Sequence, residues 1–128
     1  MSIDRKVSIT KISQSKLEAT DLISPIFGKV YSDHMLRCDF KKGTWQDLKI
    51  IPYADISISP ANTTLHYAST IFEGLKAYRN IHEEIVVFRP QDNAKRMVLS
   101  ASRMCMPGIP ESIFSGDFSS GLLSGLHC

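Results

Sequence analysis

A change of hydrophobic period at Gly74 constrains the fold of this chain more than any other feature. Before it, Leu65, Ala68 and Phe72 lie close to one helical face, and an Asn-Thr-Thr run ahead of them supplies N-cap candidates. After it, the sequence LKAY alternates apolar and polar residues, which is typical of a strand. Since glycine also favours helix ends, the pattern predicts a short helix over 62–74 that leads directly into a strand.

The segment that follows predicts a hairpin and then a long helix. Residues 75–78 alternate, residues 80–83 suit a turn, and residues 85–88 are the apolar run IVVF, so the two runs are expected to pair antiparallel. A helix is predicted from Pro90 to the Pro-Gly pair at 107–108. Its stripe at i, i+3, i+4 and i+7 spacing consists of Ala94, Met97, Val98, Ala101, Met104 and Cys105.

The first half of the chain reads mostly as strands. Residues 1–25 show no sustained period and are interpreted as an N-terminal arm. Residues 27–40 suit paired strands around the polar turn Ser32-Asp33, and another turn is expected at the Lys-Lys-Gly run that follows. Residues 45–59 suit a further strand, in which Ile56 and Ile58 would share a half-buried face. The predicted fold class is therefore α+β, an antiparallel sheet with packed helices.

The end of the chain changes character. Residues 110–114 resemble the first turn of another helix, but half of residues 115–128 are glycine or serine. Repeated glycines disfavour a helix, so this tail is predicted to be disordered. The expected organisation is an arm over 1–25, one domain over 26–114 and a tail over 115–128.

Composition narrows the class of partner. A chain of 128 residues with 43% hydrophobic residues can bury a core as one domain. Its 15 basic and 13 acidic residues are interspersed, which argues against a nucleic-acid or anionic-membrane footprint. No apolar stretch approaches the roughly 18 residues of a membrane span. A small molecule or another protein is the expected partner.

The cysteines and the N-terminus bear on the compartment. The three cysteines are far apart, which argues against a disulfide framework or a zinc site, and no other metal site is indicated. The first residues contain basic and serine side chains that would suit a mitochondrial presequence, but also acidic side chains of the wrong sign. We expect the cytoplasm, with the mitochondrion as the alternative.

Four side chains suggest a binding pocket. The aromatic residues Phe27, Tyr67 and Phe72 could line it, although aromatics at helical spacing are more often part of a core. Arg96 lies one step off the apolar stripe, where a guanidinium could bind a phosphate, or could simply be a solvated helix charge. An Asp33-His34 dyad is the other candidate, but such a pair beside a turn usually serves the turn itself.

Three segments, in order, resemble the branched-chain amino acid aminotransferases. They are FGKVYSDHM at 27–35, LHYASTIFEGLKAY at 65–78 and FRPQDNAKRMVLSASRMCMP at 88–107. The resemblance implies a fold-type-IV pyridoxal 5'-phosphate enzyme, a homodimer whose subunit has a small N-terminal α+β domain and a larger C-terminal domain. This chain resembles the small domain only.

The resemblance also assigns roles. Phe27, Tyr67 and Phe72 would wall the substrate pocket, and Arg96 would contact the cofactor phosphate. The resemblance implies leucine, isoleucine and valine with 2-oxoglutarate as substrates, and an aromatic wall would suit the three amino acids because it buries their methyl groups. The expected partners are therefore branched-chain amino acids and 2-oxo acids.

The resemblance leaves the catalytic base outside this chain. The lysine that holds the cofactor as a Schiff base is expected in the second domain, so no catalytic residue is assigned here, and Lys76 is rejected for that role. By itself the chain is expected to hold the cofactor weakly or not at all, and not to transaminate.

The departure from the family near Ser115 is interpreted as a truncated isoform, a frameshifted transcript or an incomplete gene model. The alternative functions are a non-catalytic form that docks on the full-length enzyme and a free-standing small-molecule binding module. The second of these would leave an apolar patch exposed to water.

Overall fold

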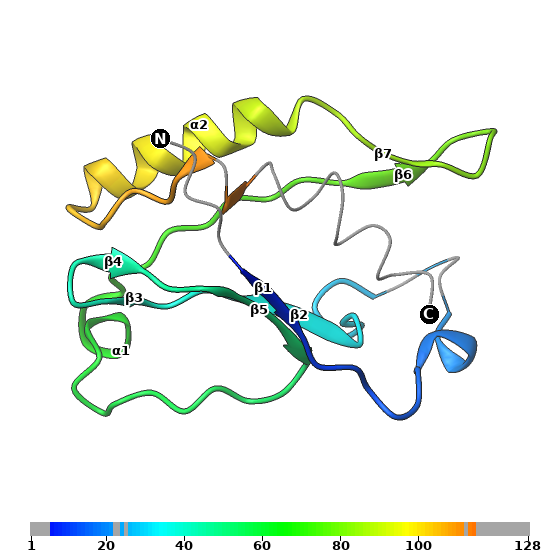
Figure 1. Ribbon diagram of the computed structural model, residues 1–128, viewed down its shortest axis with the longest axis horizontal. Helices are drawn as coiled ribbons and strands as arrows, with labels where there is room; N and C mark the ends of the chain where they lie inside the picture. Colours follow the sequence, from blue (N-terminus) through cyan, green and yellow to red (C-terminus); the bar gives the residue numbers. More distant parts are fainter. Residues whose placement is uncertain (1–5, 22–23, 25, 112, 115–128) are drawn as a thin grey trace. The chain divides into compact units, whose positions relative to one another are not determined.

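The structure is a computed structural model that describes residues 6–21, 24, 26–111 and 113–114. The backbone divides into two compact units, Met1–Ser57 and Ile58–Cys128. The first unit contains strands and one short 3-10 helix, and the α-helices lie in the second unit (Figure 1). The fold is therefore mixed α and β with small sheets, in agreement with the predicted class at this level.

Three strands form the sheet of the first unit, in the order β1 (Val7–Ile9), β5 (Leu48–Pro52) and β2 (His34–Arg37). The central residue Ile50 lies opposite Leu36 in the antiparallel pair and opposite Ile9 in a parallel pair. The sheet is thus mixed, and not wholly antiparallel as predicted. The segment interpreted as an arm contributes β1, whose β-branched Val7 and Ile9 suit a strand.

The predicted strand pair around Ser32-Asp33 is wrong, because β2 pairs with β5 and not with the residues before the turn. Asp33 explains the difference. Its carboxylate accepts hydrogen bonds from the Ser15 hydroxyl at 2.6 Å and the Lys16 amide at 3.1 Å, and its carbonyl accepts one from the Tyr53 amide at 2.8 Å. These bonds hold the segment before β2 against a loop that contains the 3-10 helix η1 (Leu17–Ala19).

The predicted strand over 45–59 is shorter in the structure. Strand β5 ends at Pro52, where its partner β2 begins at His34, so no neighbouring strand among the described residues extends the ladder. Ile56 and Ile58 are 58% and 44% exposed, and the half-buried face predicted for them is wrong.

A small hairpin precedes β5, at the predicted Lys-Lys-Gly turn. Strand β3 (Phe40–Lys41) pairs with β4 (Thr44–Trp45). The two turn residues Lys42 and Gly43 both have positive φ, 52° and 79°, as a tight two-residue hairpin requires. The rings of Phe40 and Trp45 meet edge to face at 5.2 Å across the pair.

Asp39 lies between two cations at the start of this hairpin. Its carboxylate accepts a hydrogen bond from Arg37 Nε at 2.9 Å and forms an ion pair with Lys41 Nζ at 3.0 Å. The bond from Arg37 is the larger cause, and together they lower the pKa of Asp39 from 3.8 to about 2. Because the folded pKa is lowered, this group's contribution to stability is present above pH 3.8 and is lost as the pH falls towards 2.

We therefore expect the carboxyl carbon of Asp39 to titrate by NMR well below 3.8 in the intact chain. Replacing Arg37 with methionine should move the midpoint back towards 3.8, because the strongest donor is then lost. A midpoint near 3.8 in the unsubstituted chain would contradict the ion pair.

The second unit begins with a helix that is shorter than predicted. Helix α1 spans Thr63–Tyr67, and the predicted N-cap is confirmed, since the Asn62 side chain accepts a hydrogen bond from the Thr64 amide at 2.9 Å. The helix ends at Ala68, which has a φ of 51°, and not at Gly74. β-branched Thr70 and Ile71 follow, and such residues disfavour continuing the helix.

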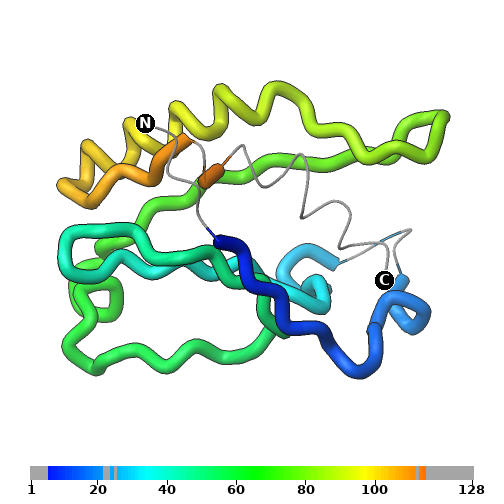
Figure 2. The backbone as a smooth tube through the Cα atoms, viewed as in Figure 1, coloured from blue at the N-terminus to red at the C-terminus, as the bar shows by residue number. Residues whose placement is uncertain are grey.

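The predicted hairpin is confirmed. Strand β6 (Ala77–Arg79) pairs antiparallel with β7 (Ile85–Val87). Figure 2 shows the two arms running side by side to a tight turn before the chain enters the long helix. Asn80 fixes the turn, because its side-chain oxygen accepts hydrogen bonds from the His82 amide at 2.8 Å and the Glu84 amide at 2.9 Å.

The predicted long helix is confirmed as α2 (Pro90–Arg103), with Pro90 in its first turn. Of its predicted stripe, Ala94 and Ala101 are buried and Met97 and Val98 are half-buried. The prediction is wrong for Met104 and Cys105, which lie after the end of the helix and are exposed. The chain then runs back along the helix, since a Cβ placed on Gly108 would lie 3.8 Å from Val98 Cγ1.

A single helical turn follows Pro110, as predicted, with the Ile113 amide bonded to the Pro110 carbonyl at 2.9 Å. Ile113 is 6% exposed and belongs to the small core of this unit. The disorder predicted for 115–128 concerns residues that lie outside the described part of the chain.

Candidate functional site

A guanidinium and a carboxylate organise the best-defined polar cluster of the second unit. Arg96, on helix α2, donates from Nε to Glu73 Oε2 at 2.8 Å and from Nη2 to Glu73 Oε1. This is a two-point, side-on pair, the geometry in which arginine binds carboxylates most strongly. Arg96 is therefore paired with a carboxylate, although its side chain remains largely exposed to solvent.

The two partners differ in exposure. The Glu73 side chain is 5% exposed, whereas that of Arg96 is 62% exposed. Asn93 completes the carboxylate's environment, because its Nδ2 donates to Glu73 Oε1 at 2.9 Å and to the Gly74 carbonyl at 3.0 Å. The hydrogen bond from Arg96, followed by that from Asn93, lowers the pKa of Glu73, so this carboxylate is ionised at neutral pH.

An aromatic ring adjoins the same segment. A Cβ on Gly74 would lie 3.2 Å from Cζ of Phe72, so the ring lies close over a residue without a side chain. Phe72 is 85% exposed, and Tyr67 at the end of α1 is 79% exposed. Neither residue is part of a core, which was the alternative role for aromatics at this spacing. Both rings are accessible to a ligand.

The remaining predicted site residue, Phe27, belongs to the first unit. Phe27 is fully exposed and lies directly before Gly28, which has a φ of 75°. The residues that the structure brings together are thus Phe72 and Arg96, through Glu73 and Gly74.

The other sequence candidates have structural roles or none. The Asp33 carboxylate binds Ser15 and Lys16, and these bonds, that from Ser15 first, lower its pKa. It is therefore occupied in holding a loop and does not form a catalytic pair with His34. Lys76 is exposed in the residue before β6. Cys38 donates from its thiol to the Gln46 carbonyl at 3.2 Å.

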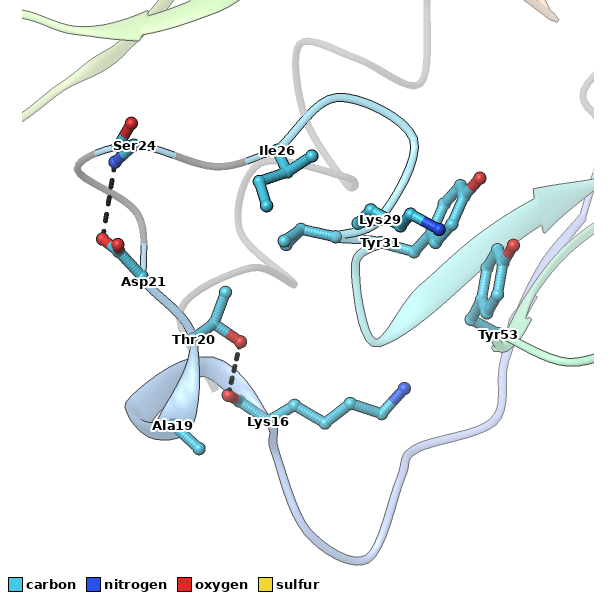
Figure 3. Close-up of a pocket in the computed structure, with 10 residues that line it drawn as sticks. Lys16, Ala19, Thr20, Asp21, Ser24, Ile26, Lys29, Tyr31 and Tyr53 are labelled. Carbon is cyan, nitrogen blue, oxygen red and sulfur yellow. Dashed lines mark hydrogen bonds between the residues drawn. The ribbon is translucent and has the colours of Figure 1, made fainter.

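The first unit contains a hollow of about 420 Å³ (Figure 3). The rings of Tyr31 and Tyr53 stack at its wall with centroids 4.8 Å apart, and Lys16 and Lys29 extend along it. None of the four residues predicted to bind substrate or cofactor is among those that line it. The hollow is therefore not part of the candidate site.

The described residues contain no group of three or more histidine, cysteine or acidic side chains placed to hold a metal ion. They also contain no helix with the length and apolar character that crossing a membrane requires.

Known proteins resemble the chain closely in sequence, although no protein-family model matches it. A branched-chain-amino-acid aminotransferase of Mycolicibacterium smegmatis is 46% identical over 94 residues, which cover 73% of this chain and 26% of that protein. One from Mycobacterium tuberculosis H37Rv is 44% identical over 94 residues, 73% of this chain and 26% of that protein. Branched-chain-amino-acid aminotransferase 2 of Bacillus subtilis is 40% identical over 108 residues, 83% of this chain and 29% of that protein.

The chain belongs to the branched-chain-amino-acid aminotransferase family. The resemblance seen in its three motifs is thereby confirmed. The chain spans less than a third of the length of these curated relatives.

Two residues of the cluster around Arg96, Glu73 and Asn93, were not predicted from the sequence. A signal for each was present. Glu73 stands between Phe72 and Gly74 in the motif FEG, and Asn93 precedes Arg96 by three residues, a spacing that puts two side chains on one helical face. What the sequence did not show is that the two segments meet, because their contact spans about twenty residues and depends on the hairpin between them.

Proposed function

We propose that this chain supplies the small-domain part of a branched-chain aminotransferase site, in a fold-type-IV pyridoxal 5'-phosphate enzyme that acts as a homodimer in the cytoplasm. The observation that carries the proposal is the oriented guanidinium of Arg96 beside the Phe72–Gly74 segment. It joins a donor suited to a phosphate with an exposed aromatic ring in one cluster. Membership of the family supports the same assignment.

The donor set of Arg96 fits the cofactor phosphate. Glu73 occupies the Nε and Nη2 side of the guanidinium, and within the described part of the chain Nη1 has no hydrogen-bond partner. A guanidinium edge with its N–H groups side by side matches the oxygens of a phosphate monoester. When bound, pyridoxal phosphate supplies the electron sink for amino transfer. Arg96 would hold its phosphate end.

The aromatic residues supply the apolar half of the proposed site. Phe27, Tyr67 and Phe72 are all largely exposed, so their rings are available to contact an aliphatic side chain. Burial of methyl groups favours leucine, isoleucine or valine by about 0.8 kcal/mol per CH₂. The proposed reaction is amino transfer between these amino acids and 2-oxoglutarate.

The reacting lysine is proposed to lie outside the residues described. Lys76 is exposed directly before β6, two residues after Gly74, and it takes no part in the Arg96 cluster. By itself the chain is expected not to transaminate.

A second candidate function is docking on complete subunits. It is favoured by the exposure of two apolar side chains, Ile81 at 92% and Phe88 at 78%. Co-purification of this chain with a complete aminotransferase distinguishes this function from the first.

A chimera tests the main proposal. Residues 26–114 replace the matching segment of the Mycolicibacterium smegmatis enzyme, which is 46% identical to this chain where they align. The chimera is expected to transfer the amino group of leucine to 2-oxoglutarate. Phe72→Ala in it should raise KM for leucine by about 10- to 200-fold, because an apolar wall is lost. Initial rates with leucine, isoleucine and valine provide the measurement.

Tyr78→Ala is the matched control, since Tyr78 is 56% exposed on β6 but has no proposed contact with substrate. Its KM should remain that of the unsubstituted chimera. A folded chimera that binds pyridoxal phosphate and rejects all three branched-chain amino acids would refute the proposed substrate class.

A further inference from the structure

The side chain of Glu73 is almost fully buried, and every hydrogen bond to it comes from the cluster around Arg96. Oε2 accepts from Arg96 Nε at 2.8 Å, and Oε1 accepts from Arg96 Nη2, from Asn93 Nδ2 at 2.9 Å and from the Gly74 amide at 3.2 Å. A carboxylate 5% exposed and bonded in this way has little freedom to rotate. It is a fixed point to which the guanidinium is attached.

The pairing determines which edge of Arg96 remains available. A guanidinium has five N–H groups, and Glu73 takes one from Nε and one from Nη2. The two on Nη1 and the second on Nη2 form the opposite edge. Since the Arg96 side chain is 62% exposed, that edge can receive a ligand while the Glu73 contact persists.

Asn93 links this arrangement to the backbone. Its Nδ2 bonds both to Glu73 Oε1 and to the Gly74 carbonyl, at 2.9 and 3.0 Å. Helix α2 is thereby attached to the segment that carries the Phe72 ring. The orientation of Arg96 and the position of that segment are coupled through one amide.

We propose that Glu73 and Asn93 are positioning residues, which hold the Arg96 guanidinium side-on so that its Nη1 edge receives the phosphate group of the ligand. The inference rests on the proposed function for the identity of that ligand. It extends the function by assigning orientation to two residues that touch neither phosphate nor substrate. The negative charge of Glu73 lowers the attraction of the site for anions in general, so the gain from holding the guanidinium is in geometry.

The test is NMR on the full 128-residue chain with ¹⁵N-labelled arginine, at neutral pH, with inorganic phosphate as the probe. The Arg96 Nε–H resonance should exchange slowly with water, because its proton is held by Glu73. Added phosphate should shift the Nη resonances and leave Nε in place. In Glu73→Gln, exchange at Nε should accelerate by about tenfold or more, and Nε should shift with phosphate as much as Nη. Asn93→Ala should produce an intermediate effect.

Glu83→Gln is the control, because Glu83 pairs with Arg79 at 2.8 Å on the hairpin and has no contact with Arg96. It should leave the Arg96 signals unchanged, and the amide spectra of all variants report whether they fold. Unchanged Nε exchange in folded Glu73→Gln, or a phosphate-induced shift of Nε as large as that of Nη in the unsubstituted chain, would overturn the proposal. Because the NMR experiment uses no amino-acid substrate, its result can be interpreted even if the chimera does not accept leucine.

Discussion

Replacing Leu48 with alanine is expected to lower the free energy of unfolding by about 2–5 kcal/mol. Leu48 opens strand β5, the central strand of the three-stranded sheet, and is 1% exposed. It is the only large side chain among the described residues that is less than 2% exposed. Removing its isobutyl group leaves a cavity that the short strands around it cannot fill.

Urea denaturation followed by the fluorescence of Trp45, in the neighbouring hairpin, measures this loss. Leu36→Ala is the matched control, because Leu36 lies in the same sheet but is 37% exposed. It removes the same atoms from a partly solvated position and should lower stability by less. Equal losses at the two positions would contradict a core centred on Leu48.

Enlarging Ala94 to leucine is expected to lower stability by about 1–3 kcal/mol. Ala94 is 1% exposed on helix α2, directly after Asn93, so added methyl groups have no space without moving the helix. Because Asn93 and Arg96 lie on the same helix, the displacement should also loosen the contact with Glu73. The same denaturation experiment gives the first effect, and faster exchange of the Arg96 Nε–H gives the second.

Lys95→Leu distinguishes overpacking from a general effect of leucine on the helix. Lys95 is the next residue and is exposed, and lysine and leucine have similar helix propensities. The free energy of unfolding of the Lys95→Leu variant should differ from that of the unsubstituted chain by less than about 0.5 kcal/mol, as is usual for surface positions. A loss as large as that of Ala94→Leu would mean that the helix, and not its buried face, is sensitive.

Local signals predicted the second unit well. The β6–β7 hairpin and helix α2 follow from alternation, from a β-branched run and from a sustained stripe, all of which are properties of neighbouring residues. The end of α1 was not predicted correctly. The sequence favoured an end at Gly74, but the helix ends at Ala68, an alanine that adopts a positive φ. The backbone amide of Ala68 bonds to the Thr63 carbonyl, which closes the helix early.

The first unit was predicted less well, because its sheet depends on contacts between distant residues. Pairing of Val7 with Leu48 joins residues about forty positions apart, and no local period signals it. Asp33 looked like an ordinary turn residue, yet its bonds to Ser15 and Lys16 decide where β2 begins. In the site, similarly, the motif predicted Arg96 and Phe72, whereas the buried carboxylate between them became apparent only from the fold.

The parallel pairing of β1 with β5 protects one edge of β5 from pairing with strands of other molecules. Strand β5 is short and apolar, with Leu48, Ile50 and Ile51 among its five residues. Its backbone groups on the β1 side would otherwise form an open edge, which is a template for adding strands from other molecules. The residues at the beginning of the chain occupy that edge. Without β1, the central strand β5 would itself become an apolar edge to which a strand of another molecule could add.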